Sequence, residues 1–166
     1  MKQKSKLWWT ISAFGAVVVA CVLAAIIFFF FIPEGDPTAI KGFPSNEQNQ
    51  TVKYIVDGLN THDVSKVYVV RGNNKTNPKD VESQLEQDKT VQAALPAPGC
   101  SYSLTSVDDR GEQGTKIIPG ITREHRTYLL DLNVDEQCPS QPPHARTLGL
   151  YFIPFMAHWT PLSFTN

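Results

Sequence analysis

The sequence of 166 residues lacks the motifs that usually mark an enzyme or a metal protein. Its four histidines are far apart, and no pair has the HxxxH or HxH spacing of a metal site. There is no GxSxG nucleophile motif and no glycine-rich loop of the kind that binds phosphate. We therefore expect no catalytic residue, no metal site and no cofactor.

An excess of positive charge is also missing, as are internal repeats and blocks of like charge. The chain has 15 Lys and Arg against 16 Asp and Glu, and all the acidic residues follow residue 32. The part after residue 32 carries a net charge of −4. Because a nucleic-acid-binding surface needs a basic patch, we expect no nucleic-acid partner.

Charged side chains are absent from residues 7–32, a run of 26 residues. A bilayer core is spanned by about 20 apolar helical residues, so this run is long enough to cross it. Three lysines lie within residues 1–6, and positive flanks stay in the cytoplasm. We expect a cytoplasmic tail over 1–6, a transmembrane helix over 7–32 that contacts lipid, and the remainder outside the plasma membrane.

Two other interpretations of this run fit its residues less well. A cleaved secretory peptide has a shorter apolar region, of about 7–15 residues. Residues 18–21, VVAC, resemble a lipobox, in which Cys21 would be lipidated. However, the apolar residues 22–32 would then follow the lipidated cysteine, where a mature lipoprotein is normally polar. Length and flanking charge therefore favour a retained anchor.

Cysteine is scarce, with only Cys100 and Cys138 beyond the apolar run. In an oxidising compartment an isolated pair of this kind indicates one disulfide. The bond would close a loop of 38 residues and contribute about 3–4 kcal/mol in the chain-entropy model. The alternative is a pair of buried free thiols.

Residues 33–45 are rich in proline and glycine, which predicts an extended linker before a domain over 46–166. A helix is expected over about 46–60, begun by a capping box of Ser45 and Gln48. Its apolar residues recur at helical spacing: Val52, Ile55, Val56 and Leu59.

Two further segments follow this helix. Residues 64–70 are expected to be a short helical or extended piece, since several of them are β-branched. Asn77 and Pro78 then occupy the favoured cap and first-turn positions of a second helix. Val81 and Leu85 share one face of it, which Val91, Ala94 and Leu95 continue imperfectly, and the prolines at 96 and 98 end it.

From Cys100 onward apolar residues alternate with polar ones, which predicts half-buried strands near 100–108, 128–138 and 147–152. If Cys100 faces Cys138 in an antiparallel pair, Leu104 faces Val134 and Ser106 faces Leu132. Even-numbered apolar residues then share one face of the sheet. The turn expected at 118–121 implies a register one residue different, which a β-bulge would absorb.

The last segment, 154–166, is apolar and aromatic but contains two prolines. Because proline is tolerated on edge strands, we expect a bent edge strand that covers the core or meets a partner. Its Phe155 and Trp159 are the candidate interaction surface.

Helices followed by antiparallel strands indicate an α+β fold. In this order, and above all in residues 49–67 (NQTVKYIVDGLNTHDVSKV), the chain resembles the nuclear transport factor 2-like superfamily. Membrane-anchored members include the Mce-associated proteins of actinobacteria and the VirB8-like components of secretion systems. The resemblance implies helices packed on a curved antiparallel sheet that forms a cone.

Two hypotheses for function follow. The first is a non-enzymatic, single-pass membrane protein whose external domain binds or scaffolds a partner protein in a cell-envelope assembly. The second is a small apolar-ligand-binding domain or enzyme that uses the interior of the cone. The candidate residues lining that interior are aromatic: Tyr54, Tyr102, Tyr128 and Phe152.

Overall fold

The structure of the protein, a computed structural model, describes residues 42–72 and 76–165. The described residues belong to one compact unit. The predicted cytoplasmic tail, transmembrane helix and most of the linker lie outside the described residues. Among the helices that are described, none combines the length and apolar character needed to span a bilayer.

The described unit has an α+β fold, as predicted. Helix α2 (Ser45–Leu59), a short 3-10 helix η1 (Val64–Lys66) and helix α3 (Pro78–Ala94) precede all the strands. Four strands then form one antiparallel sheet in the order β1-β2-β3-β4. The strands are β1 (Ser101–Lys116), β2 (His125–Gln137), β3 (His144–Phe155) and β4 (His158–Phe164).

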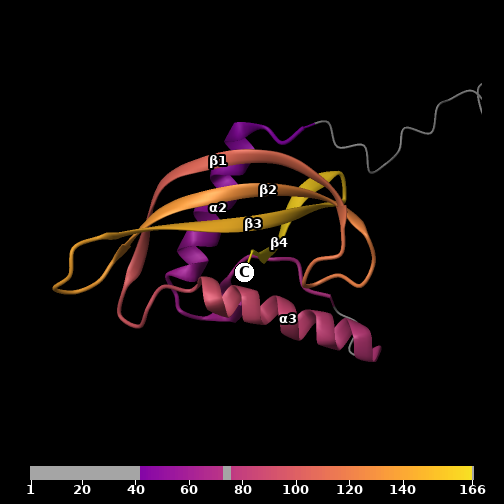
Figure 1. Ribbon diagram of the computed structural model, residues 1–166, viewed down its shortest axis with the longest axis horizontal. Helices are drawn as coiled ribbons and strands as arrows, with labels where there is room; N and C mark the ends of the chain where they lie inside the picture. Colours follow the sequence, from indigo (N-terminus) through magenta and orange to yellow (C-terminus); the bar gives the residue numbers. More distant parts are fainter. Residues whose placement is uncertain (1–41, 73–75, 166) are drawn as a thin grey trace, which may run out of the picture. The chain divides into compact units, whose positions relative to one another are not determined.

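Figure 1 shows α2 crossing the strands on one face of the sheet, while α3 lies along the side nearer β4. The inward stripe of α2 consists of the four apolar residues predicted from helical spacing, and all four are buried. Each contributes about 1.5–3 kcal/mol relative to an exposed side chain. The opposing row consists of even-numbered residues, as predicted: Tyr128, Leu130, Leu132, Val134, Leu148, Leu150 and Phe152.

The start of α2 differs from the predicted capping box. Pro44 occupies the cap position, and no side chain caps the helix. Instead, the buried amide of Gln48 donates to the carbonyl oxygen of Phe43 (2.8 Å) and to Asp109 Oδ2 (2.7 Å). The side chain of Gln48, which the predicted capping box required at the helix start, therefore bonds instead to Asp109 on the distant strand β1.

The segment after α2 is helical first and extended afterwards, so both predicted conformations occur. Asp63 caps η1 by accepting from the amide of Ser65 at 2.9 Å. Val67 and Val69 are buried in the extended part that follows.

Helix α3 begins as predicted, because Asn77 accepts from the amide of Lys79 at 3.1 Å and Pro78 follows. The predicted apolar face with Val81 and Leu85 is nevertheless exposed. The buried residues of α3 lie further along the helix and on a different side, two of them polar and two apolar: Gln87, Thr90, Val91 and Ala94. Val91, Ala94 and the following Leu95, expected to continue the apolar face, are therefore buried.

The register of β1 on β2 is as predicted near the disulfide and changes beyond it. Leu104 pairs with Val134, but a bulge follows, so Ser106 pairs with Asn133 rather than with Leu132. Two more bulges occur before the turn. A one-residue slip reverses the faces of a strand, so between the first and second bulges odd-numbered β1 residues such as Asp109 lie on the helix side of the sheet.

The final segment is the predicted edge strand. β4 pairs with the end of β3 through a register shift beside Pro161. Trp159, Leu162 and Phe164 of this strand are buried, so β4 covers the core.

Candidate functional site

The outer side of α2 borders two adjoining surface hollows. The first has a volume of about 650 Å³ and the second about 420 Å³, and Gln50, Thr51 and Tyr68 line both. We call the two together the α2 groove. The first hollow is further lined by Tyr54, Asp57, Gly58, Thr61 and Lys66. The second extends to Phe43, Glu47, Val70 and the residues of the β3–β4 hairpin.

Helical and extended periodicity together place the side chains of the first hollow. Gln50, Tyr54 and Asp57 are spaced by four and three residues, so they share the face of α2 opposite the buried stripe. Tyr68 lies between the buried Val67 and Val69 in extended chain and therefore points outward.

Gly58 allows the two walls of this hollow to approach closely. A Cβ at this buried position would lie 2.8 Å from the carbonyl oxygen of Lys66. Any larger residue would push the η1 segment away from α2. The local geometry therefore depends on a glycine that helix propensity alone disfavours.

Two tyrosines dominate the exposed apolar surface of the first hollow. The exposed fractions of Tyr54 and Tyr68 are 60% and 59%. Asp57 and Lys66 lie beside them and supply one charge of each sign. Tyrosine combines a large apolar ring with a hydroxyl group and is enriched where proteins bind one another. This arrangement suits stacking and hydrogen bonding to a partner.

The structure does not bring the four predicted pocket residues together. Tyr102, Tyr128 and Phe152 are buried members of the hydrophobic core. Tyr54 lies on the outer face of α2, because the 100° turn per residue directs it away from the side that carries the buried Val52 and Ile55. The prediction of a shared interior lining is therefore wrong for Tyr54.

The two predicted surface residues also separate. Phe155 is exposed, whereas Trp159 is only 5% exposed and packs against Tyr128 with ring centroids 5.1 Å apart. The indole Nε1 of Trp159 donates to the carbonyl oxygen of Gly42 at 3.0 Å. Trp159 is therefore a core residue rather than a surface residue. The neighbouring Met156, which sequence reasoning missed, is 81% exposed.

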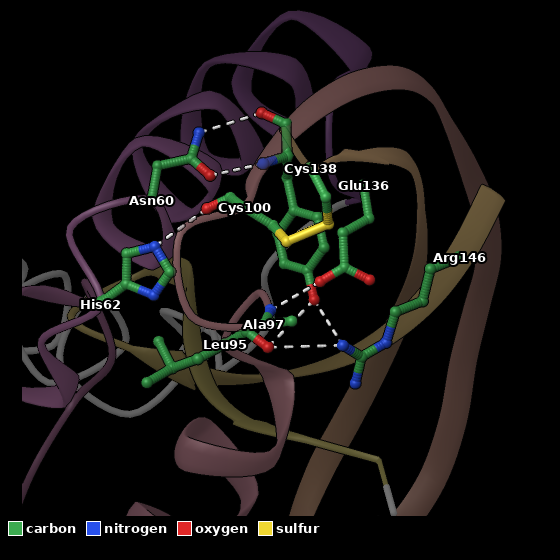
Figure 2. The surroundings of a disulfide bond; sticks show 9 residues. Asn60, His62, Leu95, Ala97, Cys100, Glu136, Cys138 and Arg146 are labelled. Atoms are coloured by element: carbon green, nitrogen blue, oxygen red, sulfur yellow. Dashed lines mark hydrogen bonds between the residues drawn. A yellow bond between two sulfur atoms is a disulfide. The ribbon is translucent and has the colours of Figure 1, made fainter. Parts of the chain in front are cut away.

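The predicted disulfide between Cys100 and Cys138 is present. Figure 2 shows that it lies among polar contacts that join α2, the end of α3 and the sheet. The side-chain amide of Asn60 pairs with the backbone of Tyr102, donating at 2.9 Å and accepting at 2.6 Å. Asn60 thereby covers the free edge of β1 near the start of the strand.

Arg146 and Glu136 hold the chain that leaves α3 (Figure 2). Arg146 donates to the carbonyl oxygens of Ala93 (2.7 Å) and Leu95 (3.4 Å) and to the hydroxyl of Tyr102. Glu136 accepts from the amide of Ala97 at 2.6 Å. The Arg146 bonds satisfy carbonyl oxygens at the helix end that have no partner within the helix, so the region is a structural junction.

A second polar cluster joins α2 to the sheet through Asp109. Its carboxylate accepts from the Tyr128 hydroxyl (2.6 Å), Gln48 (2.7 Å) and the amide of Gly111 (2.8 Å). Desolvation, the largest influence, raises the pKa of Asp109, but these hydrogen bonds together lower the pKa below its ordinary value. Burial and the adjacent carboxylate raise the pKa of Tyr128 to about 12. The pair therefore stays a neutral phenol bonded to a carboxylate, which is a structural tie.

The parts of the chain that the structure describes hold no group of three His, Cys, Asp or Glu side chains able to bind a metal ion. Comparison with protein-family models, curated proteins and solved structures finds no match for this chain.

Proposed function

We propose that this chain is a single-pass membrane protein whose external domain binds a partner protein in a cell-envelope assembly, without catalysing a reaction. The first hollow of the α2 groove is the binding surface in this proposal. The observation that carries it is the pair of exposed tyrosines, Tyr54 and Tyr68, on the walls of one hollow. Exposed apolar surface gathered in one place is typical of an interaction site.

The construction of the groove supports a role in recognition. Its walls are a packed helix and a segment anchored by buried Val67 and Val69. Surfaces on such rigid elements lose little conformational entropy on binding. Asp57 and Lys66 at the rim provide charges that can orient a partner without being buried in its centre.

The membrane attachment rests on the sequence of residues 1–32 alone. A run of 26 residues without charge after three lysines supports an anchor with the described unit outside. We also propose membership of the nuclear transport factor 2-like superfamily, supported by helices that pack against an antiparallel sheet.

A small ligand is the second candidate occupant. The first hollow, at about 650 Å³, falls within the size range of ligand pockets, which is about 300–1,000 Å³. Tyr54 and Tyr68 would then stack on a planar or apolar molecule. This differs from the interior cone pocket expected from the sequence, since the interior aromatic residues are packed in the core.

Photo-crosslinking from the groove in intact membranes tests the proposal. The crosslinking residue replaces Gln50, which is exposed and lines both hollows, in the full-length chain. A matched control places it at Leu85, which is 58% exposed on α3, on no wall of the groove. We expect one protein adduct from position 50 that is absent from position 85. Equal adducts from both positions, or none from either, would contradict a groove-specific protein partner.

A further inference from the structure

The β3–β4 hairpin ends in an unusually apolar tip. Phe155 pairs with His158, so Met156 and Ala157 alone form the loop. Phe155 is 47% exposed and Met156 is 81% exposed. The surrounding segment 153–160, IPFMAHWT, contains no acidic residue. A projecting methionine beside an exposed phenylalanine has no intramolecular function that the contacts of the described residues explain.

The backbone of this loop does not favour the residues that occupy it. Met156 and Ala157 have φ values of 48° and 63°, the pattern of a type I′ hairpin turn. Asn-Gly is the preferred pair for such turns, because residues with an ordinary Cβ are strained at positive φ. The chain therefore keeps an apolar tip where turn geometry favours polar residues and glycine, which indicates that apolar character is needed there.

The tip lies close to the point where the chain enters the described unit. Trp159, three residues after Met156, donates to the carbonyl oxygen of Gly42. Three residues of strand span about 10 Å, so the tip is within roughly that distance of Trp159. Only the nine residues 33–41 separate Gly42 from the charge-free run. Nine residues reach at most about 30 Å even when fully extended.

We propose that the hairpin tip, Phe155–Met156–Ala157, contacts the surface of the lipid bilayer. This inference rests on the proposed membrane anchor, and it adds an orientation for the external domain. A chain of only nine residues before Gly42 limits how far this end of the sheet can lie from the proposed anchor. Phe155 and Met156 enter the boundary between headgroups and acyl chains, where exposed apolar side chains are stabilised.

The β2–β3 turn provides an internal reference for this orientation. β3 has 12 residues, so its two ends lie about 40 Å apart. Gln141 is exposed in the turn before β3, whereas Met156 follows the end of β3. If the tip touches the bilayer, Gln141 lies far from it in water.

Spin labels on the full-length chain test the proposal. Met156→Cys, Ala157→Cys and Gln141→Cys are each labelled in a Cys21→Ser background and reconstituted in vesicles of phosphatidylcholine and phosphatidylglycerol. Collisions with oxygen, which concentrates in the bilayer, are compared with collisions with a water-soluble nickel chelate. We expect the oxygen-to-nickel ratio at 156 and 157 to be several-fold higher than at 141. Using two tip positions ensures that one perturbed variant does not decide the result.

Three results would overturn the inference. A ratio at both tip positions equal to that at 141 places the tip in water. Spin–spin broadening between tip labels assigns the tip to a second copy of the chain. Release of the protein from vesicles by alkaline carbonate would show that no segment spans the bilayer. That result would contradict both the inference and the proposed membrane attachment. Retention after carbonate with the tip in water would overturn the inference alone.

Discussion

At the scale of single residues, the β3–β4 hairpin combines backbone strain with exposed apolar side chains. Positive φ costs an L-residue with a Cβ roughly 1–2 kcal/mol, and both Met156 and Ala157 adopt it. Such strain usually persists where a function requires it. Met156 and Ala157 therefore lower the stability of the fold, while in the proposal they provide the membrane contact.

Replacing the loop by Asn-Gly (Met156→Asn with Ala157→Gly) should stabilise the fold by about 1 kcal/mol. The substitution relieves the strain of two positive φ values, and the entropy of the added glycine offsets part of the gain. Urea unfolding of the full-length chain measures the change. The control is Gln141→Asn in the β2–β3 turn, which should leave the free energy of unfolding unchanged. A loss of stability in the loop variant would contradict the assigned strain.

Asp109 makes the stability of the domain sensitive to acid. Its pKa in the folded state lies below its ordinary value of 3.8, so its hydrogen bonds contribute stability at pH values above 3.8. That contribution is lost as the pH falls through the lower, folded-state pKa. We expect the difference in stability between the native chain and Asp109→Asn to shrink below pH 4.

Unfolding of both proteins between pH 7 and pH 2.5 measures this difference. Asp57→Asn, an exposed carboxylate on the outer face of α2, serves as the matched control. A difference for Asp109→Asn that stays constant or grows toward low pH would contradict the role of the Tyr128, Gln48 and Gly111 hydrogen bonds.

At the scale of secondary-structure elements, α3 covers the outer edge of β4 through polar side chains. Gln87, which is buried, donates to the carbonyl oxygens of Val70 and Leu162, each at 2.6 Å. The amide of Val70 also donates to the carbonyl oxygen of Pro161 at 2.8 Å. Exposed strand edges promote unwanted pairing, and here these groups satisfy the edge directly.

Gln87→Leu should therefore destabilise the domain by roughly 2–4 kcal/mol. The substitution removes the Gln87 donor from the buried carbonyl oxygen of Leu162 and the half-buried one of Val70, and each loss costs about 1–3 kcal/mol. Gln92→Leu, at an exposed position on the same helix, is the control and should change stability little. Urea denaturation monitored by far-UV circular dichroism measures both, and equal effects would show that the edge bonds do not stabilise the fold.

The disulfide joins the first and second strands at the end where α2 and α3 also finish. Replacing both cysteines by serine should lower the free energy of unfolding by about 4 kcal/mol, from the entropy of a loop of 38 residues. Cys21→Ser, outside this loop, should have no such effect. Thermal unfolding in oxidising and reducing buffer compares the three proteins. A native chain whose stability is insensitive to reduction would contradict the prediction.

The sequence predicted the features of this unit that depend on neighbouring residues. The apolar stripe of α2, the Asn77 cap and the alternation in β2 and β3 all follow from local spacing. The disulfide pairing also gave the register as far as Leu104. A bulge between the disulfide and the turn was predicted correctly, but the positions of the bulges in β1 were not. Gly111 and Gly114, both at positive φ and both at register shifts, mark two of them.

The long-range hydrogen bonds and the groove were missed for other reasons. Gln48 and Gln87 bond to groups far along the chain, and no local pattern reports such partners. Tyr54 looked like a core residue because it neighbours the buried stripe, but a shift of one residue in a helix moves a side chain by 100°. Tyr68 lies in extended chain whose alternation is only four residues long, which is too short to predict which face is covered.

At the scale of the whole molecule, the sequence and the described unit support one account. The charge-free run supplies the proposed attachment, the hairpin tip the proposed orientation, and the α2 groove the proposed binding surface. The disulfide junction and the Asp109 cluster tie both ends of α2 to the sheet. A rigid α2 keeps Tyr54 in place for a partner, and the buried Val67 and Val69 do the same for Tyr68.

The most direct test of this account is the yield of the protein adduct formed from position 50 when the groove tyrosines are removed. Truncating a central interface tyrosine typically costs 1–2 kcal/mol, so Tyr54→Ala and Tyr68→Ala should each lower the yield about tenfold at limiting partner. Leu85→Ala, equally exposed but outside the groove, should leave it unchanged. An undiminished yield in both tyrosine variants would contradict the assignment of the α2 groove as the binding surface.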